Sequence, residues 1–120
     1  MNPIKKELRL PKYEYYEKHL SIVNSMLPIK MTEMEIKVLS RFMALEGDIA
    51  VHRFGPTARK VVKESLGITT AGLSNYLGEG KGSLIEKGFL KKTGDVIDIQ
   101  SILIPEKDEQ IYSFKLVNLG

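Results

Sequence analysis

The chain has 120 residues, of which 42% are hydrophobic and 28% charged, and it contains no cysteine. This length suits one domain with a modest core, the composition excludes an intrinsically disordered chain, and the lack of cysteine excludes disulfides and thiolate chemistry. No apolar run approaches membrane-spanning length, and the first residues lack the apolar core of a secretory signal. We therefore expect a cytoplasmic protein with no membrane partner.

The net charge of +3 is unevenly spread. Between Arg53 and Lys92 there are eight basic and three acidic residues, a balance of +5 that leaves −2 for the rest of the chain. A localised basic surface is typical of nucleic-acid-binding proteins. Lysines and arginines that only solvate helix faces would give the same bias, so charge alone leaves both interpretations open.

Residues 1–12 are predicted to form a terminal arm bracketed by Pro3 and Pro11. Its basic residues could lie along phosphates, although a loosely packed terminus is the interpretation that we favour. These basic residues are Lys5, Lys6, Arg9 and Lys12.

Residues 13–27 are predicted to form a helix that ends before Pro28. Apolar side chains recur at steps of three and four and so share one face of that helix. They are Tyr13, Tyr16, Leu20, Val23 and Leu27. The stripe either packs on its own domain, which we favour, or forms a homodimer interface.

The next predicted helix begins at Thr32, which forms a capping box with Glu35, and closes at Gly47. Residues 48–56 follow as a first-strand region. Ile49 and Val51 together, or Phe54 alone, are expected to supply a short strand edge.

Two short helices around a tight turn come next. The first is expected from about Ala58 to Leu66, with Thr57 as its N-cap and Gly67 as the left-handed residue that stops it. This helix, glycine turn and second helix together are typical of a helix-turn-helix.

Thr69 or Thr70 caps the second helix, and Leu73, Leu77 and Leu84 form its inner face. Glycines at 78, 80 and 82 each cost roughly 1 kcal/mol in a helix interior. We therefore expect this helix to break near Gly78 and to restart near Ser83.

The remainder of the chain is predicted to be β. A hairpin has strands at 89–92 and 96–100 around a turn at 93–95, and the second strand alternates apolar and polar residues. Residues 111–117 alternate again, with Tyr112, Phe114 and Leu116 against Ser113 and Lys115. That extra strand either extends the sheet or pairs with a second chain.

The run V-K-E-S-L-G-I-T-T-A-G-L-S-N-Y-L, followed by L-I-E-K-G-F-L-K-K, resembles the winged helix-turn-helix of the MarR-like superfamily of DNA-binding regulators. The resemblance covers roughly Thr32 to Gln100. It implies an α+β fold in which a three-helix core carries a β-hairpin wing, with an added N-terminal helix and an extra C-terminal strand. The corresponding division of the chain is an arm and helix at 1–31 and a winged domain at 32–120.

The chain departs from the superfamily pattern in three respects. Lys63 stands where many members have a small alanine, four extra residues separate Leu73 from Leu84, and the glycines at 78, 80 and 82 lie within that added turn. Members commonly dimerise through added helices, which supports a homodimer through the 13–27 helix as an alternative. Small members without a sensor domain are frequent in viral and mobile-element genomes, so the expected location extends to a host cytoplasm or a virion.

The candidate DNA-binding residues follow from helix geometry. With Leu73 and Leu77 facing inward, the exposed start of the second helix enters the major groove of a helix-turn-helix complex. There Asn75 can bind adenine through two hydrogen bonds, while basic residues of the preceding helix and the wing contact phosphates. The predicted residues are Arg59, Lys60, Thr69, Thr70, Ala71, Ser74, Asn75, Lys81, Lys91, Lys92 and Thr93.

The sequence contains no catalytic constellation. His19 and His52 have no partner at metal-ligand spacing, and G-E-G-K-G-S lacks the spacing of a phosphate-binding loop. We expect no enzymatic activity, cofactor or metal. The predicted partner is double-stranded DNA and the predicted role is transcription regulation. The alternative is a structural or adaptor module that docks protein in a phage particle or a replication complex.

Overall fold

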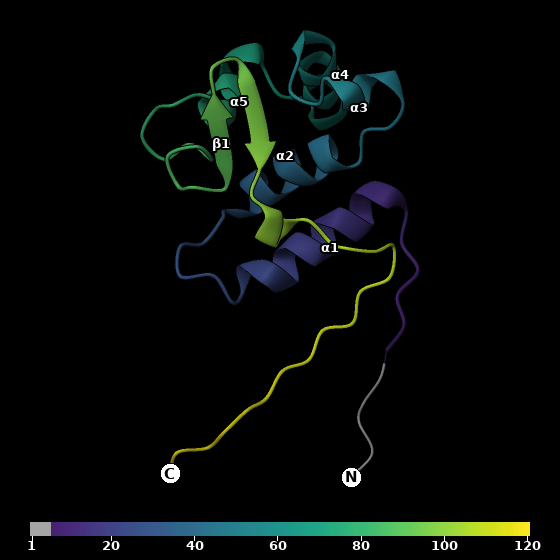
Figure 1. Cartoon of the computed structure of the whole chain (residues 1–120), viewed down its shortest axis with the longest axis vertical. Helices are drawn as coiled ribbons and strands as arrows, with labels where there is room; N and C mark the ends of the chain where they lie inside the picture. The colour runs from purple at the N-terminus through teal and green to yellow at the C-terminus, as the bar shows by residue number, and fades with distance from the viewer. Residues whose placement is uncertain (1–5) are drawn as a thin grey trace.

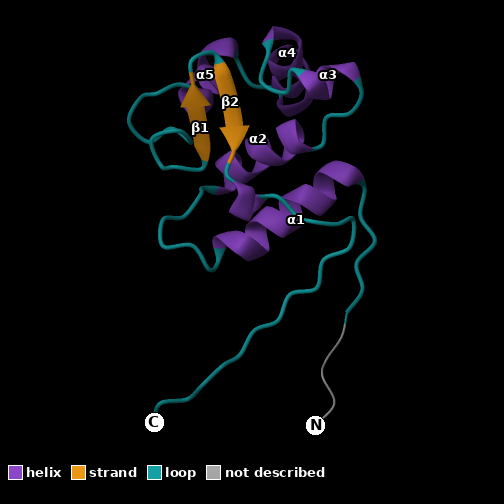
Figure 2. Cartoon of the chain, in the orientation of Figure 1, coloured by secondary structure: helices purple, strands orange, loops and turns teal. Residues whose placement is uncertain are grey.

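The computed structural model describes residues 6–120 and has an α+β architecture within that range (Figures 1 and 2). Five α-helices precede a two-stranded antiparallel sheet and a 3₁₀ turn in these residues. The elements are α1 (Lys12–Asn24), α2 (Glu33–Met43), α3 (Asp48–Val51), α4 (Pro56–Leu66), α5 (Thr70–Leu77), β1 (Leu90–Thr93), β2 (Val96–Ile99) and η1 (Ser101–Leu103). The predicted arm falls partly on residues 1–5, outside the described range.

Helix α1 packs on α2 through its apolar stripe, as the favoured interpretation predicted. Leu20 and Val23 are buried, and Tyr16 and Leu27 are partly buried against the same core. The helix ends at Asn24, three residues earlier than predicted, because the Asn24 side chain bonds both the N–H and the carbonyl of Met31 and so closes the following loop. A homodimer through this stripe would have to displace α2.

The capping box at the start of α2 is confirmed. The Thr32 hydroxyl accepts the Glu35 N–H at 3.1 Å, and Glu35 Oε1 accepts the Thr32 N–H at 2.7 Å. At the other end, the guanidinium of Arg53 donates to the carbonyls of Phe42 and Met43, at 2.7 and 3.1 Å. Arg53 therefore caps the last carbonyls of α2, of which that of Phe42 also accepts the Leu45 N–H at 3.3 Å.

The prediction of a strand at 48–56 was wrong. Gly47, with a φ of 66°, turns the chain directly into the short helix α3. Because Arg53 is held against the end of α2, this segment is folded back on the helix and does not extend along the sheet. Phe54 packs instead against Phe42, with ring centroids 4.8 Å apart, while Val51 is exposed.

The hairpin forms within a residue of its predicted bounds. Leu90 is opposite Ile99 and Thr93 is opposite Val96, which leaves a two-residue turn. Gly94 in that turn has a φ of 61°, a left-handed conformation that glycine adopts without steric cost.

The break in the second helix of the pair is also confirmed, since α5 ends at Leu77 and Gly78 is its C-cap. The predicted restart of the helix near Ser83 was wrong, because the chain there forms only a turn, in which Ser83 Oγ accepts the Glu86 N–H and the Ser83 carbonyl accepts the Lys87 N–H. Leu84 is fully buried in this turn, so it joins the core without belonging to α5.

The prediction of a strand at 111–117 was wrong, since these residues form no strand in the described structure. After η1 the chain is held along α1, where the Tyr15 hydroxyl donates to the Lys107 carbonyl at 2.9 Å. Buried His19 bonds both the Leu103 carbonyl, through Nε2, and the Tyr112 hydroxyl, through Nδ1. These contacts direct the chain away from the hairpin, so it has no strand to pair with (Figure 1).

The partners of His19 fix its tautomer. Nε2 must carry the proton to donate to a carbonyl, so Nδ1 accepts from the Tyr112 hydroxyl. Burial lowers the pKa of His19 below its usual value, although the bond to the Leu103 carbonyl opposes that shift. Burial likewise raises the pKa of Tyr112. The contact is therefore one between two neutral groups.

Candidate functional site

A basic cleft lies between α4 and α5. Its volume is about 310 Å³, and one wall is formed by residues near the start of α4. The cleft gathers three cationic side chains and two hydroxyls around the N-terminal half of α5. Its lining residues are Pro56, Arg59, Lys60, Lys63, Thr70, Leu73 and Ser74.

Local sequence explains the position of α4. Pro56 is the first residue of the helix, where its missing N–H costs nothing. The N-cap is consequently Gly55, and the prediction that Thr57 caps this helix was wrong because Thr57 already lies within the first turn. Gly67, with φ 66° and ψ 31°, ends α4 in the left-handed conformation, as predicted.

The turn sets α5 against the end of α4. Thr69, one of the two predicted caps, accepts the Gly72 N–H at 3.0 Å, while Thr70 is the first helical residue. Leu73 and Leu77 are buried, so Ala71, Ser74 and Asn75 are left exposed at the surface. The predicted orientation of this helix is therefore confirmed.

Among the residues that the structure describes, the cations of the cleft have no partner of opposite charge. Arg59 Nε donates to the Phe54 carbonyl at 2.8 Å, and Lys63 Nζ donates to the Thr70 hydroxyl at 3.2 Å. Within residues 6–120, neither these two nor Lys60 forms a salt bridge. Three positive charges thus share one surface, and their uncompensated field attracts anions.

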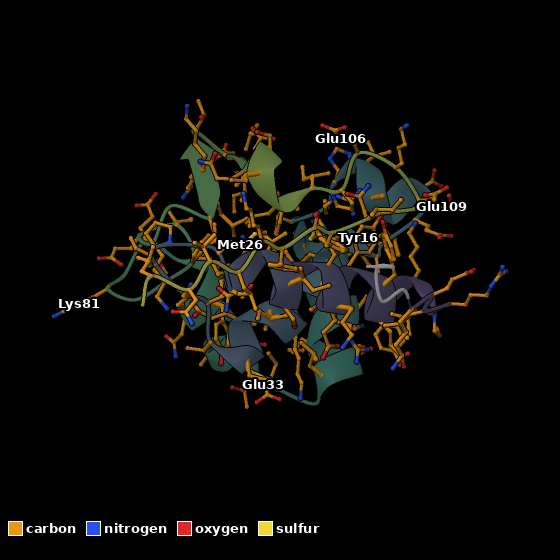
Figure 3. The ribbon with its side chains drawn as sticks, turned by 90° about the horizontal axis from the view of Figure 1, so that it is seen from below. Tyr16, Met26, Glu33, Lys81, Glu106 and Glu109 are labelled. Carbon is orange, nitrogen blue, oxygen red and sulfur yellow. The ribbon has the colours of Figure 1, made fainter. Side chains whose placement is uncertain are left out.

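A second cleft, of about 600 Å³, lies on the other side of α5. It contains three predicted residues, Thr69, Asn75 and Lys81, next to the ion pair of Glu35 and Lys87. In Figure 3 the Lys81 side chain projects from the edge of the molecule, on the glycine-rich loop after α5. Ala71 lines neither cleft.

The hairpin residues predicted to contact DNA also line neither cleft. Lys91 and Thr93 are exposed, but Lys91 lies opposite Asp98 in the sheet. Lys92 forms a salt bridge with Glu79, with Nζ 3.5 Å from Oε1. Because each lysine has an acidic neighbour, the hairpin adds little net positive charge to this face.

Sequence reasoning did not include Lys63 among the site residues. Lys63 follows Lys60 by three residues and Arg59 by four, so the three side chains lie on one face of α4. This spacing was sufficient to predict Lys63 as a site residue. Lys87 was missed for a different reason: its partner Glu35 is 52 positions away in the sequence.

The described residues also contain neither a candidate metal site nor a candidate membrane-spanning helix. No group of three or more potential ligands for a metal ion occurs among residues 6–120. None of the helices in that range is long and apolar enough to cross a membrane.

Comparison with known proteins gives no relative for this chain: no family model, no curated protein and no solved structure matches it.

Proposed function

We propose that this chain is a winged-helix DNA-binding protein that regulates transcription, with α5 as its recognition helix in the major groove. The observation that carries the proposal is the group of three cations, Arg59, Lys60 and Lys63, which form no salt bridge within residues 6–120 and lie beside the exposed start of α5. Phosphate neutralisation supplies most of the affinity in such complexes, and this arrangement sets positive charge next to a helix whose polar side chains are exposed.

The roles of the residues follow from their positions. The three cations of α4 bind backbone phosphates, and the hydroxyls of Thr70 and Ser74 add hydrogen bonds to the same backbone. Asn75 reads a base edge. Because α5 has eight residues, it is about 12 Å long, so it can contact only a few base pairs.

The proposal is tested by fluorescence anisotropy on random duplex DNA across a salt series. We expect affinity to fall steeply with salt, and Lys60→Ala to weaken binding and reduce the slope of log K against log salt by about 1. Lys18→Ala is the matched control, because Lys18 is exposed on α1 and its substitution removes the same charge. No binding at low salt, or equal losses for the two variants, would contradict the proposal.

Base reading by Asn75 has its own test. On a duplex selected for tight binding, Asn75→Ala should weaken binding by about 1–3 kcal/mol. On random duplex the same variant should bind as the unmodified chain does. If both duplexes lose affinity equally, Asn75 does not read a base.

An adaptor module that docks protein in a phage particle or a nucleoprotein assembly is the second candidate. The balanced charge of the hairpin favours it, since Lys91 faces Asp98 and Lys92 is paired with Glu79. A wing that contacts DNA phosphates would ordinarily present free cations. Absence of DNA binding at low salt would make this candidate the leading one.

A further inference from the structure

The segment 111–119 exposes an unusual amount of apolar surface. Ile111, Leu116 and Leu119 are each at least 95% exposed, and Phe114 and Val117 are about 60% exposed. Soluble monomers rarely present so many large apolar side chains together, and such a patch usually marks a contact surface.

The base of this segment is fixed while the rest is free. Hydrogen bonds from Tyr15 to Lys107 and between His19 and Tyr112 hold it on α1. From there the chain runs away from the body and from its own hairpin (Figure 1). Residues 113–117 are therefore presented outward in a non-helical segment, available to another molecule.

The hairpin of the same chain offers a matching acceptor. β1 pairs with one edge of β2, and within the described residues no strand pairs with the other edge. No backbone group of Val96–Ile99 bonds any backbone group outside the hairpin in residues 6–120. An unpaired strand edge is a template for strand addition.

The side chains of the two segments fit in one register. Lys115 is the only charged side chain between residues 111 and 120, and Asp98 is the only one in β2. When these two are placed opposite each other, the flanking apolar residues also face one another. The antiparallel register sets Phe114 opposite Ile99, Lys115 opposite Asp98, Leu116 opposite Ile97 and Val117 opposite Val96.

The parallel alternative fits less well. With Lys115 still opposite Asp98, it would place Ser113 against Val96, which is 58% exposed and apolar. The antiparallel register instead covers Val96 with Val117. It also sets Asp98 between Lys91 on one side and Lys115 on the other, and opposite charges on neighbouring strands stabilise pairing.

We propose that residues 113–117 of one copy add as an antiparallel strand to the outer edge of β2 in a second copy, and that the exchange is reciprocal. A second copy is the occupant because this chain carries both the strand and an edge that matches it in charge and apolar pattern. The resulting symmetric dimer extends each hairpin to three strands. The inference does not depend on the proposed DNA binding.

The test uses the lack of native cysteine, since two introduced thiols are then the only ones in the chain. In Val96→Cys/Val117→Cys the thiols are directly opposite across the two copies, at a separation that a disulfide can bridge. Mild oxidation should give a covalent dimer on a non-reducing gel. Val96→Cys/Ser113→Cys, which represents the parallel register, is the matched control and should stay largely monomeric.

Sedimentation of the unmodified chain should show a dimer, and deletion of residues 113–120 should give a monomer with an unchanged helical circular dichroism spectrum. Lys115→Asp, which sets two carboxylates opposite each other, should raise the dimer dissociation constant at least severalfold. A monomeric unmodified chain, a dimer that survives the deletion, an intramolecular disulfide, or preferential crosslinking in the Ser113 control would each overturn the proposal.

Discussion

The ion pair of Glu35 and Lys87 ties the turn after α5 to the start of α2. Lys87 Nζ lies 2.7 Å from Glu35 Oε1, and the side chains are 21% and 3% exposed. Within residues 6–120, Glu35 Oε2 accepts no hydrogen bond. The carboxylate therefore depends on Lys87 and on the Thr32 N–H, so replacing Lys87 by methionine should strongly destabilise the fold.

The size of the effect follows from burial. Removing one partner of a fully buried pair costs about 3–5 kcal/mol because the other charge is left uncompensated. Lys87 is one-fifth exposed, so solvent screens part of this loss, and we expect about 2–3 kcal/mol for Lys87→Met. A domain of this size has only about 5–15 kcal/mol of stability, so the change is easily measured by urea denaturation.

A double-mutant cycle isolates the electrostatic contribution of the Glu35–Lys87 pair to the free energy of unfolding. In a Glu35→Gln background the carboxamide still accepts the Thr32 N–H. No buried carboxylate is then left without a positively charged partner when Lys87 is replaced. Lys87→Met should then cost about 1 kcal/mol or less. Lys91→Met is the control for the loss of a lysine, and as an exposed residue of the hairpin it should change stability by about 0.5 kcal/mol at most. Equal losses in the unmodified and Glu35→Gln backgrounds would refute the electrostatic explanation.

Two other predictions concern local contacts. Thr69→Ala removes the N-cap of α5 and should cost about 1 kcal/mol in urea denaturation, whereas Thr70→Ala should cost less than half as much; the reverse order would contradict the capping assignment. The lowered pKa of His19 means that the unfolded chain takes up a proton before the folded chain does. Stability should thus be complete above the ordinary histidine pKa of about 6.5 and fall as the pH drops through the lowered pKa. His19→Gln should flatten this loss below the ordinary histidine pKa of about 6.5, and His52→Gln, at an exposed position, is the control for replacing a histidine.

Much of the local structure could be predicted from the sequence alone. The capping box of Thr32 and Glu35, the left-handed Gly67 and the turn at Gly94 all depend on hydrogen bonds or backbone angles within a few residues. The end of α5 at Gly78 is likewise determined by residues that are close together in the sequence. The exposed face of α5, with Ser74 and Asn75, could also be predicted, because helical periodicity places it opposite the buried leucines.

Tertiary contacts determined the rest. Arg53 reaches back to the end of α2, so residues 48–56 fold as a helical turn where a strand was predicted. The Glu35–Lys87 pair joins positions 52 residues apart, a separation that no local pattern encodes. The alternation at 111–117 gives the right period for a strand, but a strand also needs a partner edge, and anchoring at Tyr112 directs this segment away from the only hairpin in the described part of the chain. A helix satisfies its backbone within its own segment, whereas a strand depends on another segment, and that is why the helices were predicted more reliably than the strands.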